Sequence, residues 1–115
     1  KQLRWQDLID QPMIRNGTSR LLEGTSAAAL LEDSRVYITE MISLVAMLET
    51  GTSYTTLPRL AFEEGYSSLS FIPLLDPAVA RSVGILRQRG VSATPVAVEV
   101  MTLLRNVLRV YMTAN

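Results

Sequence analysis

The sequence contains neither cysteine nor histidine. Without these residues the chain can form no disulfide, thiol nucleophile or Ser-His-Asp relay, and the usual protein ligands of zinc and haem are missing. A metal site would have to consist of carboxylates alone, and the acidic residues form no cluster along the chain. We therefore expect no metal, no other cofactor and no enzymatic activity.

An excess of charge of either sign is also absent. Eleven basic and eleven acidic residues give a net charge of zero. Nucleic acids and anionic membranes are attracted by a basic field, which this chain does not produce. We expect it to bind neither of them by itself.

Long hydrophobic runs are missing as well. No run approaches the roughly twenty apolar residues that span a bilayer, and the opening "KQLRWQDLIDQP" lacks the apolar centre of a signal peptide. We expect a cytoplasmic protein without a membrane partner. The chain starts without methionine and ends directly after an apolar helix, so we interpret it as a fragment of a longer protein.

The patterns that are present predict alternating helices and strands. Apolar spacing, β-branched runs and turn residues predict, in order, a helical turn over 5–10, a strand over 12–14, a helix over 18–31, a strand over 35–38, a helix over 41–50, a strand over 53–57, a helix over 58–65, strands over 69–74 and 82–88, and a helix over 95–112. This order favours an α/β fold with a mostly parallel sheet flanked by helices.

Turn and capping residues support several of these boundaries. Thr18 and Thr94 are candidate N-caps, and Pro95 suits the first position of the last helix. Gly51 suits the left-handed position after the helix over 41–50, and Pro58 suits the start of a short helix.

Three segments together resemble the effector-binding domain of LysR-type transcriptional regulators. They are "MISLVAMLETGTSYTTLPRLAFEEG", "LSFIPLLDP" and "ARSVGILRQRGVSATPVAVEVMTLLRNVL", and "RWQDLIDQPMI" resembles the family's entry into its second subdomain. The resemblance implies one lobe of a periplasmic-binding-protein-like fold, with the second lobe over about 1–82 and a returning strand and C-terminal helix over about 83–115. One departure is the turn Gly51-Thr52-Ser53, where the family commonly has Gly-x-Gly.

The resemblance also implies a function. It predicts a sensor that binds a small effector, most simply an anion, in a cleft between two lobes and controls transcription within a homo-oligomer. DNA would be bound only through a helix-turn-helix domain that is absent from this chain. The alternative is a solute-binding component of a transport system with the same fold; a helix-turn-helix or a signal peptide upstream of Lys1 would distinguish the two.

The loop Asn16-Gly17-Thr18-Ser19 is the first candidate for effector binding. It follows a predicted strand and precedes a predicted helix, and ligands of open α/β sheets bind beyond the carboxyl ends of the strands. The resemblance supports this assignment, because effectors of the family contact the matching loop. A purely structural role, in which Thr18 only caps the helix, remains open beside it.

Other candidates surround this loop. Arg15 and Arg20 flank it and can pair with a carboxylate, although exposed arginines commonly bind nothing. Thr39, Glu40 and Met41 follow the strand over 35–38 and form the next turn at the same edge, with capping by Thr39 as the alternative.

The remaining reactive side chains suggest no catalysis. The carboxylate pairs Asp7/Asp10 and Glu63/Glu64 are expected on solvated surfaces, where general acids are rare. Ser67–Ser70 has no neighbouring base to activate a serine. The helix over 95–112 is apolar around most of its circumference, and we expect it to self-associate together with "SVGILRQ" or to pack on a missing lobe.

Overall fold

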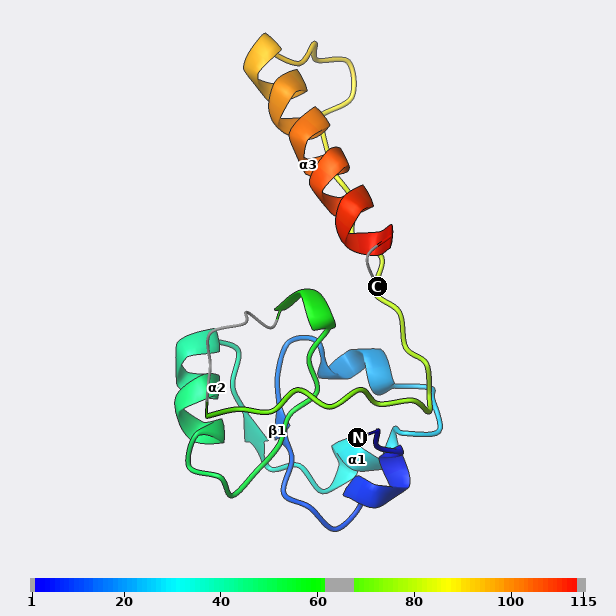
Figure 1. Cartoon of the computed structure of the whole chain (residues 1–115), viewed down its shortest axis with the longest axis vertical. Helices are drawn as coiled ribbons and strands as arrows, with labels where there is room; N and C mark the ends of the chain where they lie inside the picture. Colours follow the sequence, from blue (N-terminus) through cyan, green and yellow to red (C-terminus); the bar gives the residue numbers. More distant parts are fainter. Residues whose placement is uncertain (1, 62–67, 114–115) are drawn as a thin grey trace. The chain divides into compact units, whose positions relative to one another are not determined.

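A computed structural model describes residues 2–61 and 68–113 of the chain (Figure 1). It divides into two compact units, Lys1–Arg81 and Ser82–Asn115. Its elements are the 3₁₀ helix η1 (Trp5–Leu8), β1 (Ile14–Arg15), the 3₁₀ helix η2 (Ser19–Leu22), α1 (Ala29–Glu32), β2 (Val36–Tyr37), α2 (Met41–Leu48), the 3₁₀ helix η3 (Arg59–Ala61) and α3 (Pro95–Thr113).

The first unit is built around short parallel pairings. β1 and β2 pair in parallel, with Ile14 opposite Val36 and Arg15 opposite Tyr37. On the other side of β1, Met13 forms a parallel bridge with Tyr54, and the Ile14 N–H donates to the Tyr54 carbonyl at 2.8 Å. The expected α/β class with parallel pairing is therefore confirmed, although the sheet is much smaller than expected.

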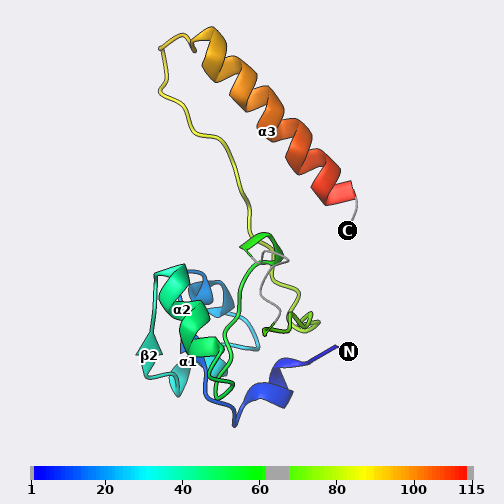
Figure 2. The same cartoon turned by 60° about the vertical axis from the view of Figure 1, so that its left-hand side comes forward.

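The core of this unit is one cluster of buried apolar side chains. Met13, Leu22, Ala27 and Leu30 form one buried cluster, and Trp5, Leu8, Leu31 and Tyr54 pack against it. Leu44 of α2 is buried as well. In Figure 2, β2 leads into the turn that opens α2, and α2 runs back in the opposite direction.

Several predicted elements are confirmed. The helical turn at the start is η1, and the helix over 41–50 is α2, which ends two residues earlier than predicted. Gly51 has a φ of +74°, the left-handed conformation expected of the residue after a helix. Among the described residues only glycines have positive φ, so Ser53 completes this turn without the conformation that favours a second glycine.

The helix predicted over 18–31 is wrong as a single element. It is divided into η2 and the one-turn α1. Gly24 lies between them with a φ of +73°, a conformation that ends a right-handed helix. The Thr25 hydroxyl donates to the Leu22 carbonyl at 2.6 Å and stabilises this interruption.

The strands predicted over 53–57, 69–74 and 82–88 are also wrong. The first two contribute single bridge residues, Tyr54 and Leu74, the latter paired in parallel with Leu3. The segment 82–88 forms no strand within the described part of the chain, and its side chains are exposed. β-Branched runs predict strands only where a second strand is present to complete the ladder, and this segment has none.

Only the start of the helix predicted over 58–65 is visible, as η3. The rest of it and the Glu63/Glu64 pair lie outside the described residues.

The second unit consists of the segment 82–94 and α3. The Ala97 N–H donates to the Thr94 hydroxyl at 3.2 Å, which confirms Thr94 as the N-cap, and Pro95 begins the helix. In Figures 1 and 2 the segment before α3 and α3 itself run in opposite directions. No helix of the described residues is both long and apolar enough to cross a membrane.

Candidate functional site

Three parallel segments end at one edge of the first unit. They are β1, β2 and the residues around Tyr54, and the polypeptide leaves them through the Asn16–Ser19 loop, the turn before α2, and Thr55–Thr56. The Ile38 N–H donates to the Arg15 carbonyl at 2.9 Å, so Thr39 follows directly beside Arg15. The structure thus gathers the predicted site residues at the carboxyl edge of the sheet, where α/β proteins bind ligands.

The Asn16 side chain holds this edge together. Its Nδ2 donates to the Thr55 hydroxyl at 2.8 Å and to the Thr56 carbonyl at 2.9 Å. Its Oδ1 accepts from the backbone N–H and the hydroxyl of Thr18, both at 2.7 Å. Asn16 is only 5% exposed, so its amide serves the loop and is not presented to solvent.

Ser19 and Thr18 also have structural roles in this loop. The Ser19 side chain is fully buried, and its hydroxyl accepts from the Asn16 N–H at 2.9 Å. Thr18 precedes η2 but makes no side-chain capping bond. Thr18 thus occupies the predicted N-cap position, but the predicted side-chain capping is wrong, because its hydroxyl donates to the Asn16 Oδ1 instead.

Only some of the predicted site residues at this edge remain accessible to a ligand. Gly17 is exposed, and within the described residues its N–H has no acceptor. Arg15 is half-buried, and its Nε is buried without a hydrogen-bond partner. Thr39 and Met41 are exposed, and Thr39 does not cap α2, whose N-cap position is occupied by Glu40.

The start of α2 offers backbone N–H groups that can donate to an anion, and the Glu40 carboxylate that would repel one. Glu40 at the N-cap makes no capping bond to the backbone, which leaves the first N–H groups of the helix without an intrahelical partner. The Glu40 carboxylate accepts from the Ser43 hydroxyl at 2.8 Å on the surface. An anion that approaches α2 would therefore meet both favourable N–H dipoles and an unfavourable carboxylate.

Thr55 and Thr56 are the site residues that the sequence reasoning missed. The Thr55 hydroxyl donates to the Ile14 carbonyl at 2.7 Å, and so joins β1 to the third segment. The signal for them is the run "YTTL", in which two consecutive hydroxyls lie within the strand predicted over 53–57.

The other candidate groups show no catalytic geometry. Asp7 accepts from the Arg4 N–H at 2.9 Å and thereby stabilises the start of η1. Ser68 donates to the Glu49 carboxylate at 2.7 Å on the surface, and Arg20 is exposed. In the ranges 2–61 and 68–113, no group of three or more acidic residues is arranged to hold a metal ion.

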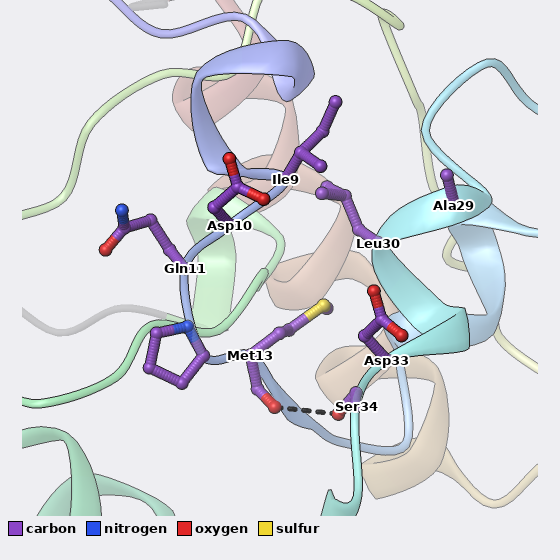
Figure 3. A pocket seen from close by; sticks show the side chains of 9 residues that line it. Ile9, Asp10, Gln11, Met13, Ala29, Leu30, Asp33 and Ser34 are labelled. Carbon is purple, nitrogen blue, oxygen red and sulfur yellow. Dashed lines mark hydrogen bonds between the residues drawn. The ribbon is translucent and has the colours of Figure 1, made fainter.

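A separate hollow lies at the opposite, amino edge of the sheet. Its volume is about 310 Å³, and its lining includes Asp10, Met13, Leu30 and Asp33. Figure 3 shows Leu30 and Met13 extending toward it, with the Ser34 hydroxyl bonded to the Met13 carbonyl at 2.7 Å. None of the predicted site residues lines this hollow.

The comparisons with known proteins found one informative similarity. No model of a known protein family matches the chain, and no solved structure matches it. The chain is 31% identical over 113 residues to YbhD of Escherichia coli (strain K12), which is described as an uncharacterized HTH-type transcriptional regulator. This alignment covers 92% of the chain and 36% of YbhD, so the chain spans about a third of that protein's length.

The relative is a regulator and not an enzyme, which agrees with the expectation that this chain is not an enzyme. The similarity extends over nearly the whole chain and supports a relationship to transcriptional regulators.

Proposed function

We propose that the chain is the ligand-sensing part of a LysR-type transcriptional regulator. It binds a small anionic effector at the carboxyl edge formed by the Asn16–Ser19 loop, Arg15, Thr39 and Met41. The similarity to a transcriptional regulator supports the regulatory role, and favours it over a component of a transport system. The parallel order of the segments supports one lobe of a periplasmic-binding-protein-like fold.

The observation that most favours an anionic effector is the buried Nε of Arg15, which has no hydrogen-bond partner. A buried guanidinium nitrogen without a partner costs free energy that a bound oxygen atom would recover. A carboxylate or sulfate group at this edge would accept hydrogen bonds from Arg15, from the Gly17 N–H and from the start of α2.

In this proposal Asn16 and Ser19 hold the loop in place. Their hydrogen bonds fix the loop, so that Gly17 is presented in one conformation before the effector arrives. A site that is already ordered loses less conformational entropy on binding. These two side chains therefore position the site and do not contact the effector.

Regulation requires that the effector favour one arrangement of two lobes over another, because only differential binding shifts an equilibrium. A helix-turn-helix outside this segment would then meet DNA in a changed geometry within a homo-oligomer.

Arg15 provides the first test. We expect titration of the chain with sodium sulfate and sodium benzoate, followed by NMR, to shift the Gly17 and Met41 amide signals. Arg15→Gln should weaken this binding about tenfold, which corresponds to one hydrogen bond to a charged group. Glu40→Gln should strengthen it, because a competing carboxylate is removed.

Arg20→Gln is the matched control, since Arg20 lies on the other side of the same loop and is exposed. An equal loss of binding in Arg15→Gln and Arg20→Gln would contradict the role of Arg15. Shifts confined to residues away from this edge would overturn the proposed site.

A further inference from the structure

The hollow at the amino edge of the sheet combines apolar and acidic side chains. It is lined by residues of two segments of the first unit, 9–13 and 29–34. Met13 and Leu30 are buried members of the core cluster, whereas Asp10 and Asp33 are exposed to solvent. In the view of Figure 3 the ends of the Met13 and Leu30 side chains lie between the two carboxyl groups. The hollow therefore has an apolar floor with a carboxylate on each side.

Neither of these carboxylates is neutralised within the described part of the chain. No hydrogen bond or ion pair of the residues 2–61 and 68–113 involves Asp10 or Asp33, and no basic side chain lines the hollow. Arg35, the basic residue nearest to Asp33 in the sequence, directly precedes β2 and is not part of the lining. Two unpaired carboxylates beside one space create a negative potential that attracts cations.

We propose that this hollow binds an aliphatic diamine, with one ammonium group at Asp10, the other at Asp33, and the methylene chain over Met13 and Leu30. Ammonium groups donate charge-assisted hydrogen bonds to carboxylates. Methylene groups gain free energy when they leave water for an apolar surface. The volume of about 310 Å³ is at the lower end for small-molecule sites, which suits a ligand of this size.

Other cations match this lining less well. A hard divalent metal ion takes about six or more oxygen ligands, and the described residues contain no group of three or more acidic residues that could hold one. A lysine side chain of another protein has a single ammonium group, so one of the two carboxylates would remain unpaired. A diamine pairs with both carboxylates and also covers Met13 and Leu30.

A series of ligands tests the proposal on the intact chain. At low salt, where screening is weak, 1,4-diaminobutane and 1,5-diaminopentane should shift the Ala29 and Ser34 amide signals in NMR spectra. The shifts should saturate at millimolar concentration, because exposed ion pairs are individually weak. Butylamine and pentylamine, which represent a lysine side chain, should bind about three- to fivefold more weakly. Ammonium chloride should cause no saturable shift, since it has no apolar part.

Equal binding of the diamines and the monoamines would overturn the proposal, as would a titration of the diamines that does not saturate at these two amides. The signals differ from those of Gly17 and Met41 that report on the anion site. The outcome therefore does not depend on whether the proposed effector site is correct.

Matched variants test the two carboxylates separately. Asp10→Asn and Asp33→Asn should each weaken diamine binding about three- to fivefold. Each should affect pentylamine much less, because one carboxylate remains for its single ammonium group. Glu32→Gln is the control: it removes one negative charge next to Asp33 in the sequence, and Glu32 is exposed and does not line the hollow. An equal loss of diamine binding in Glu32→Gln would indicate only general attraction by negative charge and would overturn the proposal.

Discussion

At the scale of single residues, Asn16 carries the most connections of any predicted site residue. It joins β1, the start of η2 and the Thr55–Thr56 segment through its side-chain amide. Removing this amide takes away the hydrogen bonds that it makes to the half-buried Thr55 hydroxyl, Thr56 carbonyl and Thr18 N–H. We expect Asn16→Ala to lower the free energy of unfolding by about 2–3 kcal/mol.

Urea denaturation measures this change. Gln6→Ala is the control, because Gln6 is exposed on η1 and no side-chain hydrogen bond of the described residues involves it. A loss in Asn16→Ala no larger than that in Gln6→Ala would show that the network contributes nothing to stability.

Tyr54 gives the first unit a dependence on alkaline pH. Burial raises the pKa of the Tyr54 hydroxyl from 10.0 to about 12, because the phenolate loses hydration in the packed surroundings of Leu8 and the core. The folded state thus binds this proton more tightly than the unfolded state. The resulting stability is complete below pH 10 and is lost as the pH rises toward about 12.

Urea unfolding across this pH window should therefore show a falling midpoint in the parent chain. Tyr54→Phe should flatten that fall, since phenylalanine does not ionise, at the cost of the 3.4 Å bond from the hydroxyl to the Leu8 carbonyl. Tyr37→Phe, at an exposed position on β2, should retain the steep fall. A slope that Tyr54→Phe leaves unchanged would assign the pH dependence to other groups.

At the scale of elements, the helices that depend on residues close together in the sequence are the ones that the sequence predicts best. α3 and α2 depend on apolar spacing, and their ends depend on Thr94, Pro95 and Gly51, which act within one turn of the chain. The same reasoning predicts a loop over Asn16–Ser19 between a strand and a helix; in the structure Asn16–Thr18 lies between β1 and η2, and Ser19 begins η2.

The elements that failed are those whose formation depends on a distant partner. The runs over 53–57 and 82–88 have the residue types of strands, but a strand also needs a neighbour to accept and donate its hydrogen bonds. Likewise, Thr18 has the residue type of a cap, yet Asn16 competes for its hydroxyl. The burial of the Arg15 Nε depends on tertiary packing, and no pattern in the sequence indicates it.

At the scale of the whole molecule, the two units differ in how well they are packed. The buried apolar side chains of the described residues lie between Met13 and Leu44, within the first unit. The described side chains from Arg81 to Ser92 are all exposed, and this segment is in neither a helix nor a strand. Proteases cleave where an exposed backbone can be extended into their active site.

We therefore expect trypsin under limiting conditions to cleave first after Arg81, Arg87 and Arg89. Arg15 and Arg35 provide the internal comparison: Arg15 lies in β1, and Arg35 directly precedes β2. Mass spectrometry of the early digest should find fragments ending at residues 81, 87 or 89 before any fragment ending at 15 or 35.

The remaining fragment should keep the hydrogen bonds of Asn16, since all their partners lie before residue 57. Its Gly17 amide should therefore retain its NMR signal. Early cleavage after Arg15 or Arg35 would mean that the parallel pairing of β1 and β2 opens as readily as the exposed segment does.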